Sequence, residues 1–225
     1  MNSARERRSA FTLIEVVVVI AVMGILMSFV VPSISGVLER SRKVNAMNCM
    51  KKLADAYLMY RETKGDFISA DGHHPKNVAD FALTLAQAGF LNDPNGYVFS
   101  SDAKAQRINK SKRDTIVAAD GITDAQCWST RDNEHSFSIN IIVDLPAFCP
   151  PNTTPIIFTR GLNQNGHWDD NGVFKKGGYI AFLDGQVKWF DDVENKLWKA
   201  DMTATTSDIS EAIPSGSRIL TALTA

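Results

Sequence analysis

The stretch Arg7-Arg8-Ser9-Ala10-Phe11-Thr12-Leu13-Ile14-Glu15 places a basic leader directly before a long apolar segment, and this arrangement is the most informative feature of the sequence. Residues 11–34 hold 24 side chains, and Glu15 is the only charged one among them. At a rise of about 1.5 Å per residue, such a helix spans about 36 Å, enough to cross a hydrocarbon core. A carboxylate there is costly in lipid, so Glu15 is a candidate functional residue that needs a partner.

The motif resembles the N-terminal signal of type IV prepilins and type II secretion pseudopilins, in which a small residue precedes Phe-Thr-Leu-Ile-Glu. The match runs without a gap from Ala10 to Glu15. The resemblance implies that a prepilin peptidase cleaves between Ala10 and Phe11 and methylates the new terminus at Phe11. It also implies that Glu15 neutralises the terminal amine of a neighbouring subunit during assembly. The family usually has Gly before the cut, so Ala10 predicts slower cleavage.

Physical chemistry favours the same pairing. An amine at Phe11 and the carboxylate of Glu15 would both lie in hydrocarbon, where isolated charges are costly. A staggered neighbour would let the two groups meet and would fix the register between subunits. The alternatives are an ordinary signal anchor with a chance Glu, or a cleaved secretory signal. The second requires a small-residue site after the apolar core, and here that site precedes it.

Charge is distributed unevenly along the chain, although the formal net charge is only −1. Residues 35–64 carry seven bases and three acids, whereas residues 65–225 carry 14 bases and 20 acids. An acidic C-terminal region argues against nucleic acid as a required partner, because phosphate binding needs clustered Lys and Arg. The arginines before the apolar segment place the leader in the cytoplasm by the positive-inside tendency.

The helical pattern continues beyond the apolar segment. Apolar residues recur at spacings of three and four through residues 33–64, and Gly65 signals the end of the helix. Gly24 and Pro32 mark a region of predicted helix flexibility, with a static kink as the equal alternative. We therefore expect a leader over residues 1–10, a transmembrane or filament-core helix over 11–34, an amphipathic continuation over 35–65 and a globular head over 66–225.

The sequence of the head predicts a mixture of helices and strands. A short helix is predicted for residues 77–88, and strands for 137–143, 156–159 and 179–183. Asp184-Gly185 joins the last of these to residues 186–190 as a hairpin. The apolar residues near the C-terminus, around Ile219 and Leu220, are either a final strand or a mobile end. The predicted fold class is α+β and pilin-like, with one long N-terminal helix packed on a mainly antiparallel β head. The segment 178–190 also resembles the Asp-Gly hairpin of prepilin-type proteins from planctomycete and verrucomicrobial bacteria.

Two further sites are candidates. The Asx- and Gly-rich loop 163–172 offers oxygen ligands for calcium, with Asp169, Asp170 and Asn171 as candidates, although such clusters are also ordinary turn formers. Major pseudopilins of type II secretion carry a calcium loop, which strengthens the candidate; otherwise no cofactor is expected. Cys127 and Cys149 are candidates for a disulfide worth about 3 kcal/mol in an oxidising compartment. The sequence holds no catalytic motif, so no enzyme activity is expected.

The resemblance implies a structural subunit of a type IV pilus-like fimbrium or of a type II secretion pseudopilus. It would be a methylated membrane precursor in the inner membrane and then part of a periplasmic or cell-surface filament. The implied partners are other copies of the chain, the prepilin peptidase, the inner-membrane assembly platform and minor pilins. The alternative is a monomeric membrane-anchored binding or sensor module in which Glu15 is incidental.

Overall fold

The computed structural model describes residues 12–102, 116–117, 137–170, 172–174 and 176–221. Within the first of these ranges, it describes only the backbone of residues 29–35. The chain divides into two compact units, residues 1–42 and 43–225. Helix α1, Leu13–Lys64, contributes its first part to one unit and its second part to the other. The predicted α+β class with a long N-terminal helix and an antiparallel β head is confirmed.

In the first unit, α1 has no packing partner among the described residues. Its described side chains from Leu13 to Arg42 are exposed, including the large apolar ones. The helix runs through Gly24 and Pro32 without a break in its secondary structure, and the flexibility predicted at these residues stays a prediction. A membrane span was predicted over residues 11–34. Within the described part of the chain, no helix is long and apolar enough to cross a membrane, so that span is not confirmed.

In the second unit, the C-terminal part of α1 is amphipathic. Buried residues recur at Ala46, Met50, Leu53 and Tyr57, the spacing that places side chains on one helix face. The helix ends at Lys64, and Gly65 follows with φ of 81°, a left-handed conformation that glycine adopts without a Cβ clash. The N–H of Gly65 donates to Arg61 O at 3.0 Å and so closes the last turn.

An antiparallel five-stranded sheet forms the head. Its strands, in the order β4-β3-β2-β1-β7, are Val187–Phe190, Gly178–Phe182, Pro155–Thr159, Ile139–Val143 and Arg218–Leu220. The Asp184-Gly185 turn joins β3 to β4, with Tyr179 opposite Trp189, as the predicted hairpin requires. The C-terminal apolar residues form edge strand β7, where Leu220 pairs with Ile141. The smaller elements are α2 (Val78–Gln87), η1 (Pro94–Gly96), β5 (Leu197–Trp198), β6 (Thr205–Thr206) and α3 (Ile209–Ala212).

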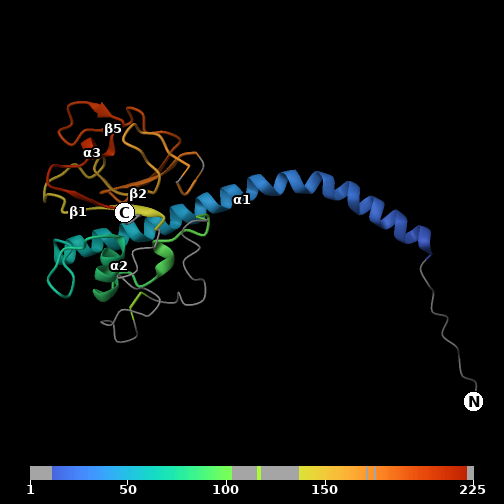
Figure 1. The fold of residues 1–225 in the computed structure, drawn as a ribbon, viewed down its shortest axis with the longest axis horizontal. Helices are drawn as coiled ribbons and strands as arrows, with labels where there is room; N and C mark the ends of the chain where they lie inside the picture. The colour runs from blue at the N-terminus through green and yellow to red at the C-terminus, as the bar shows by residue number, and fades with distance from the viewer. Residues whose placement is uncertain (1–11, 103–115, 118–136, 171, 175, 222–225) are drawn as a thin grey trace, which may run out of the picture. The chain divides into compact units, whose positions relative to one another are not determined.

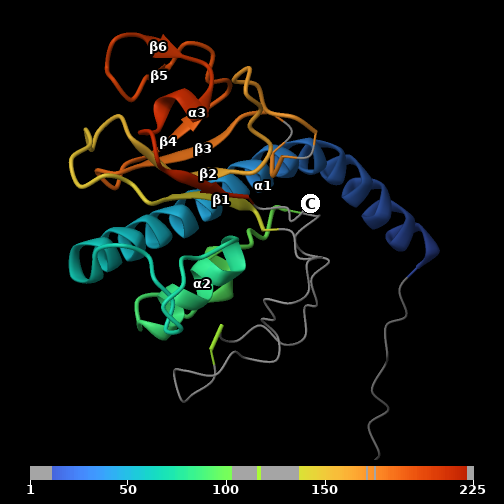
Figure 2. The same ribbon diagram turned by 60° about the vertical axis from the view of Figure 1, so that its left-hand side comes forward.

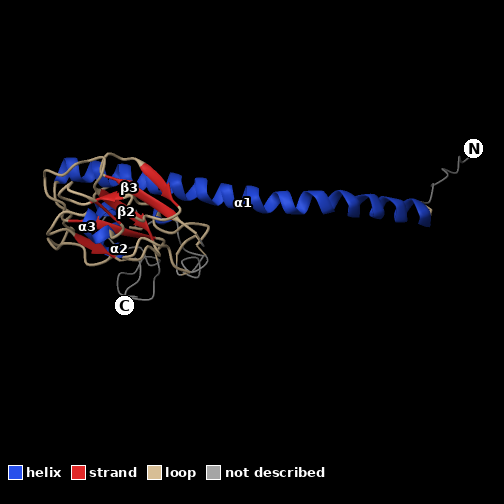
Figure 3. Ribbon diagram, turned by 90° about the horizontal axis from the view of Figure 1, so that it is seen from above, coloured by secondary structure: helices blue, strands red, loops and turns tan. Residues whose placement is uncertain are grey.

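Within the head, α1 is enclosed on two sides, as Figures 1 and 2 show. Tyr57 makes both contacts: its hydroxyl donates to Ile142 O in β1 at 2.8 Å, and its ring lies 6.0 Å from Phe81 in α2. The β5–β6 hairpin and α3 lie on the side of the sheet away from α1 (Figures 1 and 2), and Figure 3 distinguishes the helices from the strands by colour. All residues of β2 and β3 are therefore buried, which explains why these strands lack an apolar–polar alternation.

A buried polar network lies beside this core. Asp102 and Arg160 form an ion pair at 2.7 Å, with side chains only 2% and 4% exposed. Arg160 also donates to Phe137 O at 2.7 Å, and the Ser138 hydroxyl donates to the second carboxylate oxygen of Asp102 at 2.8 Å. Asp102 and Phe137 flank segment 103–136, so the network ties the two flanks of that segment together.

Candidate functional site: the carboxylate at the start of the N-terminal helix

Glu15 lies in the first turn of α1, where Thr12 holds its carboxylate. The backbone N–H of Thr12 donates to Glu15 Oε2 at 2.8 Å, and the Thr12 hydroxyl donates to the same oxygen at 2.9 Å. In return, the N–H of Glu15 donates to Thr12 Oγ1 at 3.4 Å. This reciprocal pattern is a capping box, which satisfies N–H groups that an α-helix leaves unpaired at its start.

The role of Thr12 was not expected from the sequence, although a signal for it is present. A Ser or Thr three residues before an acidic residue, directly ahead of an apolar run, indicates a capping box. Thr12 and Glu15 have this spacing. Glu15 therefore has two possible uses: it caps its own helix, and it presents a negative charge to a partner.

No cation pairs with Glu15 in the described part of the chain. No Lys, Arg or His occurs between Thr12 and Leu38, so α1 itself brings no base near this carboxylate. The carboxylate is exposed in the structure and receives hydrogen bonds from Thr12. A positive partner for it would have to come from another molecule or from residues outside the described part of the chain.

The surface around Glu15 is apolar on every side of the helix. Leu13 is 82% exposed, and the Val, Ile, Leu and Met side chains from Val16 to Met27 are all exposed as well. A helix that is hydrophobic all round is ordinarily buried in a membrane or within other protein. An exposed apolar helix surface of this kind is typical of a segment that associates with lipid or with other protein.

The other residues predicted to act in processing lie outside the described residues. These are Ala10 and Phe11, which flank the predicted cleavage site. Their roles stay predictions.

The calcium candidates are only partly described, because Asn171 lies outside the described residues. The backbone N–H of Asp169 donates to Gly161 O at 2.8 Å, and the N–H of Gly172 donates to Asp169 O at 3.0 Å. Asn165, in the same loop, accepts a hydrogen bond from the N–H of His167 at 3.2 Å through its side-chain oxygen. Within the described residues, no group of three or more His, Cys, Asp or Glu side chains is arranged to hold a metal ion. Calcium binding by Asp169 and Asp170 stays a prediction.

The predicted disulfide has one member in the described residues. Cys127 lies outside them, so its pairing with Cys149 stays a prediction. Cys149 lies next to α1, where its thiol donates to Pro146 O at 3.2 Å and lies 3.9 Å from the Arg61 guanidinium. Cys49 lies on α1, and its thiol donates to Asn45 Oδ1 at 3.3 Å.

Comparison with known proteins bears on the same N-terminal segment. A family model described as the prokaryotic N-terminal methylation motif matches residues 5–31. The type II secretion system core protein G of Aeromonas hydrophila is 42% identical over 57 residues, which cover 25% of this chain and 40% of that protein. The core protein G of Escherichia coli K12 is 35% identical over 88 residues, covering 39% of this chain and 55% of that protein.

A third relative, the core protein G of Vibrio cholerae, is 40% identical over 55 residues, covering 24% of this chain and 38% of that protein. The chain thus spans about half or less of the length of these curated relatives. No solved structure matches the chain. The matched residues include the capping box and the apolar part of α1. The motif and the similarity to core protein G over this N-terminal region support the resemblance to the type IV pilin and pseudopilin family.

Proposed function

We propose that the chain is a structural, non-catalytic subunit of a type II secretion pseudopilus or of a related type IV pilus-like filament. The observation that carries the proposal is Glu15: a carboxylate in an apolar, exposed helix that has no cationic partner in the described part of the chain. The similarity to core protein G supports the secretion form over the surface pilus.

The proposed route begins in the inner membrane, with the N-terminus in the cytoplasm. The prepilin peptidase cleaves between Ala10 and Phe11 and methylates the new terminus. The assembly platform then moves the subunit into a periplasmic or cell-surface filament that also contains minor pilins. In the filament, Glu15 pairs with the Phe11 amine of a neighbour, because two opposite charges in an apolar environment are far less costly together than apart.

Replacing Glu15 by Gln tests the pairing without removing the helix cap. Gln at this position still accepts the hydrogen bonds of Thr12, since capping boxes contain either Glu or Gln. The change removes only the negative charge. A buried charge that loses its partner costs about 3–5 kcal/mol, so filament yield should fall by about a hundredfold or more.

The matched control is Glu194→Gln, which removes the same charge from an exposed site in the head. Filament yield is measured as the subunit in the sheared fraction relative to the subunit in the membrane. We expect the control to assemble like the wild type and Glu15→Gln to remain in the membrane. Normal assembly of Glu15→Gln would contradict the proposal. Complete absence of wild-type filaments would favour the anchored binding module.

A further inference from the structure

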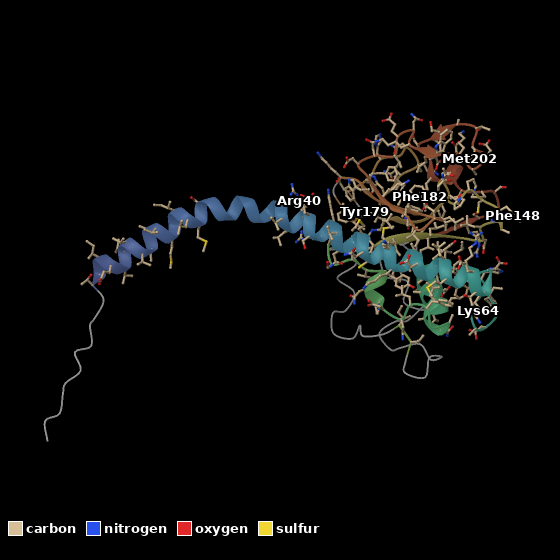
Figure 4. All side chains as sticks on the ribbon, turned by 180° about the vertical axis from the view of Figure 1, so that it is seen from behind. Arg40, Lys64, Phe148, Tyr179, Phe182 and Met202 are labelled. Carbon is tan, nitrogen blue, oxygen red and sulfur yellow. The ribbon has the colours of Figure 1, made fainter. Side chains whose placement is uncertain are left out.

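An open groove of about 440 Å³ lies beside the C-terminal end of α1, within the head unit. Its apolar lining comes from α1, from the segment after β1 and from the segment after β3: Leu58, Leu145, Ala147 and Leu183. Phe148 follows Ala147 and is 97% exposed. Figure 4 shows Phe148 and Lys64 at the same end of the head unit. The groove and the neighbouring phenyl ring thus form an apolar surface at the end of the head where α1 stops.

The charged side chains of the groove differ in the contacts that they make within the head. Arg61 donates to Pro146 O and to Leu145 O, so its guanidinium holds the segment after β1 in place. Glu62 and Asp66 also line the groove, and both are exposed. Neither of these two carboxylates has an ion-pair partner among the described residues. The groove therefore suits a ligand that is apolar and carries a positive charge.

Another part of α1 has this character. Val37, Arg40 and Val44 stand at positions i, i+3 and i+7, the spacing that places three residues on one face of a helix. Val37 is 65% exposed, Val44 is 52% exposed, and Arg40 is exposed too. Within the described residues, Arg40 forms no ion pair. We call these three residues the basic stripe.

We propose that the basic stripe of one copy of the chain binds the groove of a second copy, with Arg40 pairing with Glu62 or Asp66. This inference rests on the proposed filament function, which supplies the second copy. The contact uses a recurrent mode of recognition, in which a helix lays residues at i, i+3 and i+7 into a groove. Because the stripe and the groove are different parts of one chain, the contact is heterologous, and such contacts can continue into an open helical filament.

Charge reversal tests the pairing. Arg40→Glu puts a carboxylate opposite Glu62 and Asp66, and the double variant Glu62→Lys, Asp66→Lys puts cations opposite Arg40. An exposed ion pair changes an association constant by up to about fivefold, and reversal adds a repulsion of similar size. We therefore expect about tenfold less filament from each of these variants. The triple variant that combines all three changes should recover most of the wild-type yield.

The matched control is Arg42→Glu, which makes the same change at an exposed residue two positions away and off the stripe. It should assemble like the wild type. The contact is refuted if Arg40→Glu assembles normally, if Arg42→Glu is equally defective, or if the triple variant is no better than its parents. Wild-type filaments in the same experiment keep this outcome separate from failure of the proposed function, which would leave no filaments at all.

A second measurement locates the contact directly. Ala147 lines the groove and is exposed, so a photoreactive benzoylphenylalanine at this position should not disturb the core. On illumination of filaments, we expect it to cross-link to peptides that contain residues 37–44 of another copy. Cross-links formed only to other segments would overturn the proposal even if the charge variants behaved as expected.

Discussion

Replacing Asp102 by Asn should destabilise the head strongly, because the change removes the carboxylate that pairs with the buried Arg160. Asn keeps the size of the side chain and an oxygen that can accept from Ser138, so the loss of negative charge dominates. The Arg160 side chain is 4% exposed, and its guanidinium lies 2.7 Å from the carboxylate that would be removed. Breaking a buried ion pair by removing one partner costs about 3–5 kcal/mol. That is a large share of the about 5–15 kcal/mol that stabilises a typical domain.

The assay is thermal unfolding of the full chain in detergent, followed by circular dichroism. At about 2–4 °C per kcal/mol for a protein of this size, the midpoint should fall by about 6–20 °C. Asp55→Asn is the control, because Asp55 is exposed on α1 and should change the midpoint by less than about 2 °C. The apolar double variant Asp102→Leu, Arg160→Met should be less destabilised than Asp102→Asn, since it buries no unpaired charge. A midpoint for Asp102→Asn within about 2 °C of the wild type would show that the buried ion pair does not stabilise the head as expected.

Three further predictions concern the packing of the head. Tyr57→Phe removes the hydrogen bond to Ile142 O and should cost about 1 kcal/mol in urea unfolding, whereas no change would mean that the carbonyl finds another donor. Burial raises the pKa of Tyr57 and Tyr97, so these side chains stay protonated in the folded protein, whereas in the unfolded chain they ionise above about pH 10. The free energy of unfolding should therefore fall as the pH rises beyond that value. A free energy of unfolding that stays constant between about pH 9 and 11 would contradict this prediction. Gly178→Ala would place a Cβ 2.2 Å from Thr159 Oγ1 and should lower the free energy of unfolding by about 1–3 kcal/mol. The control is Gly36→Ala, whose added Cβ would have no atom within 4 Å and should leave the unfolding of the head unchanged.

The features that sequence analysis predicted correctly are those encoded by neighbouring residues. The long helix follows from apolar spacing and from the stop at Gly65. The β3–β4 hairpin follows from Asp184-Gly185, where Gly185 has φ of 80° and its N–H donates to Phe182 O at 2.9 Å. Glu15 stood out because one charge in a long apolar run is conspicuous, and its pairing with a neighbouring subunit stays a prediction.

The features that were missed depend on residues far apart in the chain. Nothing local shows that β7 pairs with β1, because the register is set by which side chains share the core. The Asp102–Arg160 pair joins residues 58 positions apart, and Asp and Arg are ordinarily exposed, so neither residue stands out in the sequence. The groove beside α1 was also missed, since three separate segments form it.

We propose that the chain is processed at its N-terminus and assembled into a filament. Mass spectrometry of the N-terminal peptide, on filaments sheared from cells that express the chain, tests both parts together. We expect a terminal peptide that begins at methylated Phe11. An intact Met1 terminus, recovered only from the membrane fraction, would contradict it.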